Sequence, residues 1–183
     1  TGVQTCALPI YVTKDGGLSW NTYTASGFTI VSFAIHPTNP EKVWIASSNS
    51  TNRVLVSTNA GATFTNISSN LPSMAARSVI VDETADEGIY VGMNIGVYYT
   101  NKNMTSWVNL TDNLPQVAIN EIELHKSSGK LRLGTYGRGL WQRSVYNPCG
   151  LPGSLSSSNV TSTSAILNWT AVSGATGYNL EYK

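Results

Sequence analysis

The carboxylates of this chain are the first residues to examine for chemistry, because paired acids can hydrolyse sugars. Among 10 Asp and Glu residues, Glu121 and Glu123 stand two positions apart in an alternating stretch, which places them on one face of a strand. Glycosidases need two carboxyl groups about 5 to 10 Å apart across the sugar. This pair is the best enzymatic candidate, but a solvent-facing strand edge is the interpretation we favour. We therefore expect no catalytic residue in this chain.

Arginine side chains could instead hold an acidic ligand. Arg138 stands between Gly137 and Gly139, in a loop from which a guanidinium could reach a carboxylate. The alternative, which we favour, is a structural fork that donates to backbone carbonyls. No helix is expected after this loop, which excludes a phosphate-binding loop. The arginines available for an anionic ligand are Arg53, Arg77, Arg132, Arg138 and Arg143.

The sequence contains no motif that is typical of a metal or cofactor site. His36 and His125 have no second ligand at metal spacing, so we expect no metal and no cofactor. Cys149 could form a disulfide outside this sequence or remain a free thiol, and both readings stay open. We interpret the Asn-x-Ser/Thr triplets as a coincidence of composition. They begin at Asn49, Asn66, Asn103, Asn109, Asn159 and Asn168.

A repeated eight-residue stretch must position these side chains. Residues 13–20 recur as 57–64, and in a worn form as 100–107, with a hydroxyl residue first, Asp or Asn third, Gly fifth and an aromatic eighth. A short Asx side chain can bind the amides of a turn, and Gly supplies the positive φ. We therefore predict three hairpin turns. Their structural residues are Asp15, Gly17, Trp20, Asn59, Gly61, Phe64 and Trp107.

The repeat also predicts the strands. The step of 43 or 44 residues between copies is typical of β-propeller blades with several strands each. We expect small residues at Ala46, Gly92 and Gly134 near the axis, and a last unit that lacks its fourth strand. The predicted strands are 31–35, 42–46, 53–57 and 63–67; 78–81, 89–93, 97–100 and 106–110; and 121–124, 130–134 and 139–144, with two more within 11–23.

Composition narrows the function. An apolar fraction of 41% with 11% charged residues is globular and all-β in character, with turn residues between short apolar runs. A net charge of +1 gives no field for nucleic acid. No apolar run approaches the roughly 20 residues that a membrane span needs. We expect neither nucleic-acid binding nor a membrane span, and a monomeric arrangement within a larger chain.

With these motifs in place, the turn stretch resembles the Asp-box, or BNR repeat, of sortilin-like and xyloglucanase-type propellers. Asp15, Gly17 and Trp20 fit it best, whereas Lys102 and Met104 break the third copy. The segment 134–141 is similar to the last blade of such propellers in large secreted bacterial proteins. The resemblance covers about residues 11–147 and implies a fold, not an activity, because enzymes and non-enzymes share the box.

The end of the chain resembles a second fold. Residues 160–169 and 177–182 are similar to the opening of a fibronectin type III domain, in which Trp169, Tyr178 and Tyr182 would lie in the core. We expect so short a piece to be marginal in isolation. Residues 1–10 resemble the translation of a sequencing adapter, and we interpret them as an artefact. The expected domains are therefore a propeller fragment (11–147), a linker (148–153) and a truncated fibronectin type III domain (154–183).

These expectations give the fold as about three and a half four-stranded propeller blades followed by the first strands of a β-sandwich. The function expected is a non-catalytic binding or adhesion module of a secreted or cell-surface protein, whose loops contact protein or glycan. The alternative is a fragment of an extracellular glycoside hydrolase, xyloglucanase-like or sialidase-like, with its catalytic residues in missing blades.

Overall fold

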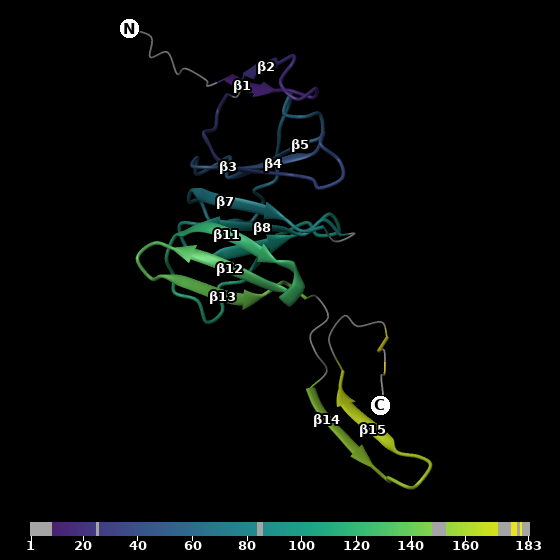
Figure 1. The fold of residues 1–183 in the computed structure, drawn as a ribbon. Helices are drawn as coiled ribbons and strands as arrows, with labels where there is room; N and C mark the ends of the chain where they lie inside the picture. The colour runs from purple at the N-terminus through teal and green to yellow at the C-terminus, as the bar shows by residue number, and fades with distance from the viewer. Residues whose placement is uncertain are drawn as a thin grey trace. The chain divides into compact units, whose positions relative to one another are not determined.

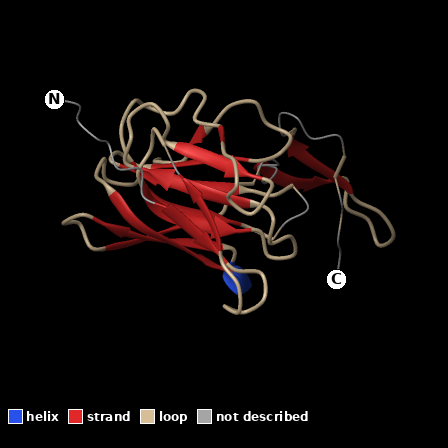
Figure 2. Ribbon diagram, turned by 90° about the horizontal axis from the view of Figure 1, so that it is seen from above, coloured by secondary structure: helices blue, strands red, loops and turns tan. Residues whose placement is uncertain are grey.

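The structure is a computed structural model, and it describes residues 9–24, 26–83, 86–147, 153–171, 177–178 and 180. Over these residues the fold is all-β, with several small antiparallel sheets and one helical turn, η1 (Lys126–Ser128) (Figure 2). The chain divides into two compact units, Thr1–Val145 and Tyr146–Lys183.

Two sheets of the first unit have four strands each, paired in chain order. The first full sheet consists of β3 (Ile30–Ile35), β4 (Val43–Ser47), β5 (Val54–Ser57) and β6 (Thr65–Asn66). The second full sheet consists of β7 (Ala76–Val81), β8 (Ile89–Met93), β9 (Val97–Thr100) and β10 (Val108–Asn109). In both, a short last strand pairs with a longer third strand.

The other two sheets of this unit are smaller. The third sheet consists of β11 (Ile119–His125), β12 (Lys130–Thr135) and β13 (Leu140–Ser144). A two-stranded sheet pairs β1 (Pro9–Val12) with β2 (Asn21–Thr24). The sheets follow one another in chain order, and the leading strands β3, β7 and β11 contact one another in that order (Figure 1).

The strand boundaries agree best with the sequence in the middle of each sheet, where β8 and β9 have the predicted bounds. The last strands are shorter than predicted at both ends, because each begins only after the eight-residue turn and an Asx turn ends it. The side chain of Asn66 accepts the N–H of Ser68 at 2.8 Å, and Asn109 accepts that of Thr111 at 2.7 Å. A backbone N–H that binds a local side chain has left the ladder.

The packing between neighbouring sheets depends on side-chain size at the second strands. Trp44 on β4 and Tyr90 on β8 are buried, as expected of core aromatics. Gly92 is crowded: a Cβ there would lie 2.7 Å from Ser78 Oγ and 2.8 Å from the carbonyl oxygen of Ile119. Close approach of strands therefore requires a residue without a side chain at this position.

Each leading strand begins with a β-bulge. The register shifts pass over Val31 on β3, Arg77 on β7 and Asn120 on β11. A bulge turns one side chain out of the ladder. The loops that follow the second strands lie at the same end of the sheets. In each loop one backbone N–H donates to the carbonyl oxygen of the residue two positions before the bulged residue. These bonds are Ser48 to Thr29 (3.1 Å), Asn94 to Ala75 (3.1 Å) and Tyr136 to Ala118 (2.9 Å).

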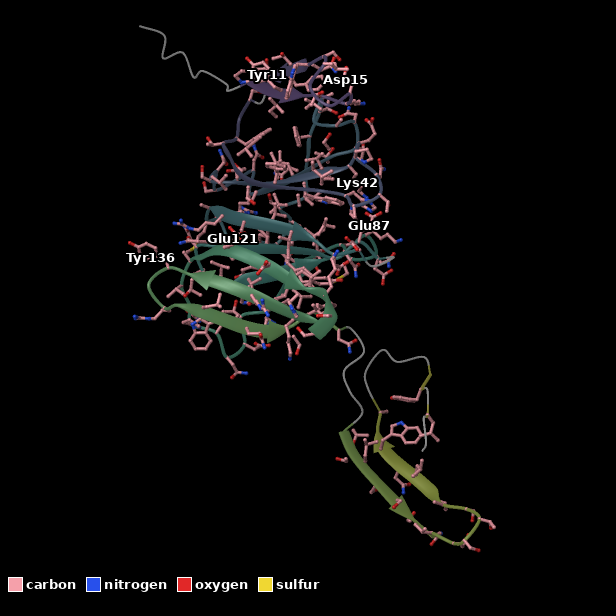
Figure 3. The ribbon with its side chains drawn as sticks, viewed as in Figure 1. Tyr11, Asp15, Lys42, Glu87, Glu121 and Tyr136 are labelled. Carbon is pink, nitrogen blue, oxygen red and sulfur yellow. The ribbon has the colours of Figure 1, made fainter. Side chains whose placement is uncertain are left out.

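We call this end of the sheets, marked by Val31, Arg77 and Asn120, the bulge end. The opposite end, the turn end, holds the eight-residue turns and the loops between first and second strands. In Figure 3 the labelled Glu121 and Tyr136 lie toward one side of the sheets, whereas Lys42 and Glu87 lie toward the other. Functional groups at the two ends therefore belong to separate surfaces.

The second unit contains β14 (Gly153–Ser158) paired antiparallel with β15 (Ile166–Thr170). Strand β14 begins at Gly153, which the sequence placed in the linker, and its Gly-Ser-Leu-Ser-Ser-Ser sequence carries too few apolar residues to predict a strand. The rings of Trp169 and Tyr178 meet edge to face, 5.3 Å apart. Cys6, Cys149 and Tyr182 lie outside the described residues.

Candidate functional site

The first turn motif commits Asp15 to its own backbone. Asp15 Oδ1 accepts the N–H of Ser19 at 2.9 Å, and Oδ2 accepts its hydroxyl at 2.5 Å. The Thr13 hydroxyl donates to Asp15 Oδ1 at 2.8 Å and accepts the N–H of Gly17, also at 2.8 Å. These bonds to Ser19 and Thr13 lower the pKa of Asp15 to about 2. Asp15 is thus an ionised turn residue at neutral pH, which leaves it no proton to donate.

The second copy builds the same turn with an amide. Asn59 Oδ1 accepts the N–H of Thr63 at 2.9 Å, while Asn59 Nδ2 donates to the Thr63 hydroxyl at 2.8 Å. Ser57 is equivalent to Thr13, and its hydroxyl accepts the N–H of Gly61 at 2.8 Å. Gly61 has a φ of 87°. The turn therefore needs an oxygen acceptor at its third position and does not need a charge there.

The motif aromatics connect or close the sheets. Phe64 packs edge to face on Phe28 with centroids 5.6 Å apart. The indole N–H of Trp107, a buried side chain, donates to the carbonyl oxygen of Ile67 in the preceding sheet at 2.8 Å. Trp20 is 58% exposed and donates to the carbonyl oxygen of Gly17 at 3.2 Å. These rings serve packing rather than a ligand, except for the open face of Trp20.

Glu121 and Glu123 both lie exposed on β11, where they pair with Gly134 and Arg132 of β12. Their positions two residues apart put them on the same face of one strand. They do not come from two sides of a gap, as acids that flank a sugar must. The arrangement suits a solvated strand face.

Arg138 differs from the expectation of a structural fork. Its side chain is exposed and makes no hydrogen bond to any described residue, although its carbonyl oxygen accepts the indole N–H of Trp141 at 2.8 Å. The fork is found at Arg53 instead, where the buried guanidinium donates to the carbonyl oxygens of Ser50 at 2.6 Å and Ser69 at 3.3 Å. Sequence alone could not separate the two, because burial decides which arginine is structural.

The bulge end brings together a group that the sequence did not single out. Arg77 Nε donates to Asn94 Oδ1 at 2.5 Å, and Arg77 Nη1 donates to Asn120 Oδ1 at 3.3 Å. Arg77 lies on β7 and Asn94 directly follows β8 of the second full sheet, whereas Asn120 lies on β11 of the third. The guanidinium is exposed, and two neutral amides hold it across the junction of two sheets. The sequence signal that could have found it is the spacing of 43 residues between Arg77 and Asn120, which is the step of the repeat.

A second polar group occupies the turn end between the two full sheets. Lys42 pairs with Glu87, and its ammonium lies 5.2 Å from the centroid of the Trp44 ring. This hydrogen bond from Lys42 lowers the pKa of Glu87. His36 Nδ1 accepts the backbone N–H groups of Thr38 and Asn39, at 3.2 and 3.1 Å. These groups satisfy one another and fix the loops of the turn end.

An apolar cavity of about 640 Å³ lies between the two-stranded sheet and the first full sheet. Phe33 and Ile35, on the face of β3 that lines it, are 63% and 50% exposed. On β7 the register equivalent of Phe33, Val79, is buried, and that of Ile35, Val81, is half-buried. Its lining is mostly apolar, and its two charged side chains, Lys14 and Glu41, form an ion pair with each other.

No family model and no curated protein matches this chain. Within the described ranges, no group of three or more His, Cys, Asp or Glu side chains could hold a metal ion. Nor does a helix long and apolar enough to cross a membrane occur among them. The site must be argued from its geometry, and the bulge end is the surface where charged, amide and aromatic side chains gather without forming ion pairs with one another.

Proposed function

We propose that this chain is a non-catalytic extracellular binding module, formed by blades of an Asp-box β-propeller and the opening strands of a fibronectin type III domain. The bulge end is its binding surface, and a glycan or a protein is its ligand. We include a secreted or cell-surface location in this proposal, because adhesion modules act outside the cell.

The propeller interpretation is supported by two repeated networks. The turns at residues 13–20 and 57–64 form matching hydrogen bonds from hydroxyl, Asx and glycine positions. Each leading strand then repeats one bulge and one loop closure. Blades of a propeller repeat such contacts once per unit, since each packs on the next in the same way.

Binding without catalysis is supported by where the acids lie. Asp15 is used by its turn, Glu87 is paired with Lys42, and Glu121 and Glu123 share one strand face. The observation that carries the proposal is Arg77, a cation held in place by neutral amides at an open surface. Such preorganisation lowers the entropy lost on binding.

A panel of glycans and extracellular proteins, incubated with the full chain, tests the proposal. We expect at least one ligand whose binding falls when Asn120 is replaced by alanine and is unchanged for Lys14→Gln at the turn end. A blank panel would contradict the binding function. Hydrolysis of a β-glucan or a sialoside that is abolished by Glu121→Gln would instead make the chain part of an enzyme.

A further inference from the structure

We propose that the bulge end binds an acidic sugar and that the Arg77 guanidinium receives the sugar's carboxylate. This inference rests on the binding function proposed above and names the class of its ligand.

The position of Arg77 follows from the backbone. The register of β7 with β8 skips Arg77, so its side chain leaves the alternation of the strand. Its neighbours on either side, Ala76 and Ser78, are buried and hold the strand in place. The guanidinium therefore stands on a rigid element, which keeps a binding group within a narrow range of positions.

The hydrogen bonds of Arg77 use only some of the N–H donors of its guanidinium. A guanidinium has five N–H groups, of which Nε and one on Nη1 bind the two amide oxygens. The remaining three bind no described residue and can meet a ligand. Because Asn94 and Asn120 turn their oxygens toward Arg77, their NH₂ groups face away from it and add donors. Arg77 also forms no ion pair with a described carboxylate.

A set of fixed donors around a planar fork selects a carboxylate. Two parallel N–H groups of an arginine match the two oxygens of a carboxylate, and the charge strengthens both bonds. A neutral ligand would leave this charge uncompensated. The ionised acid is therefore the group that fits Arg77.

The rest of the bulge end favours a sugar over an acidic peptide. Tyr136 is 73% exposed in the loop that closes over this end, and its ring offers a flat apolar face with a polar tip. Amide groups such as those of Asn94 and Asn120 can both donate to and accept from sugar hydroxyls. None of these three side chains lines any of the three cavities that the structure describes.

The test uses tetragalacturonic acid and its fully methyl-esterified form, which differ in charge but not in ring structure. Calorimetric titration of the full chain should show the free acid binding about tenfold or more tightly than the ester, as expected for a charged hydrogen-bonded pair. Arg77→Gln should remove this preference. Asn94→Asp should remove it too, because the new carboxylate would pair with Arg77 while keeping the shape of the side chain.

Lys126→Gln is the control for charge, since Lys126 pairs with Glu83 at the turn end. It should keep the preference for the free acid. Thermal unfolding of each variant separates loss of binding from loss of folding. Equal binding of acid and ester, or an unchanged preference in folded Arg77→Gln, overturns the inference.

Two further results separate this inference from the binding function. An acidic peptide that binds through Arg77 while the uronate does not would overturn the choice of a sugar. A neutral glycan or a protein that binds the bulge end independently of Arg77 would overturn the inference and leave the proposed binding function standing.

Discussion

The side chain of Asn70 binds both backbone polar groups of Trp107. Its Oδ1 accepts the N–H of Trp107 at 2.7 Å, and its Nδ2 donates to the carbonyl oxygen at 2.9 Å. One amide thus imitates a strand partner and joins the end of the first full sheet to the turn motif of the second. This explains the Asn of the Asn-Leu-Pro sequence after β6; in the second copy, at residues 113–115, Asn113 forms no such bond with a described residue.

Replacing Asn70 by alanine should lower the free energy of unfolding by about 1–3 kcal/mol, because two partly buried backbone groups lose their partner. Urea denaturation measures the change. Asn113→Gly is the matched control at the next repeat. Asn113 has a φ of 60°, which glycine tolerates, and no hydrogen bond of its side chain to a described residue would be lost. Equal effects of the two variants would contradict this role of Asn70.

Gly92→Ala should destabilise the fold by about 1–3 kcal/mol, the cost of overpacking a core. The added methyl group would meet Ser78 and backbone of Ile119 at 2.7–2.8 Å. At the equivalent position of the third sheet, Gly134→Ala should cost less, because the nearest atom is Glu121 Cβ at 3.3 Å. Thermal unfolding of both variants checks the order, and a larger loss for Gly134→Ala would show that crowding does not select glycine here.

Acid should weaken the first turn. Because the folded pKa of Asp15 is about 2 and its ordinary value is 3.8, the ionised carboxylate stabilises the folded chain above about pH 4. This contribution is lost as the pH falls from about 4 to 2. Asn at this position cannot titrate but keeps the acceptor, as Asn59 does. The stability difference between the chain and Asp15→Asn should therefore change in that range.

Denaturation at a series of pH values from 2 to 6 measures this difference. Glu123→Gln is a suitable control, because Glu123 is exposed and makes no hydrogen bond or ion pair with a described residue. Parallel curves for the chain and Asp15→Asn between pH 4 and 2 would show that the turn does not depend on the ionised carboxylate.

Ser68→Ala should lower the free energy of unfolding by about 2 kcal/mol, since two buried N–H groups would lose their acceptor. Ser68 Oγ accepts the N–H of Arg53 at 2.9 Å and that of Val54 at 3.1 Å, and Ser68 is 2% exposed. Ser68→Thr should be milder, because Thr111 at the next repeat accepts the N–H of Val97 with its hydroxyl. Amide exchange at Val54 reports the local effect; unchanged protection in Ser68→Ala would argue against it.

The all-β class and the middle strands could be predicted from the sequence, because alternation and turn residues act locally. The side chains that end or join strands could not. Asn66 and Asn109 lie in Asn-x-Ser/Thr triplets, which we interpret from the sequence as a coincidence of composition. In the structure each of them forms an Asx turn. Their role depends on which backbone N–H lacks a ladder partner, which only the register of the sheet decides.

The candidate site was predictable only in part. Arg138 was identified from its flanking glycines, and it is exposed as a binding residue must be. In the sequence, Arg77 is one of five arginines with nothing to distinguish it. The structure distinguishes it by the β-bulge that directs its side chain and by its hydrogen bond to Asn120, 43 residues later. A bulge adds one residue to a strand without a distinct sequence signal, so alternation cannot reveal it.

The order of the sheets also sets how the chain opens. Strand β8 is buried along its whole length between neighbours, whereas β1 and β2 pair only with each other and are largely exposed. Amide protons of β8 should therefore exchange with solvent most slowly in the first unit, and those of β1 and β2 most rapidly. Local fluctuation would then begin at residues 9–24 and reach the second full sheet last, so Arg77 and Asn94 keep their positions while the outer strands fray.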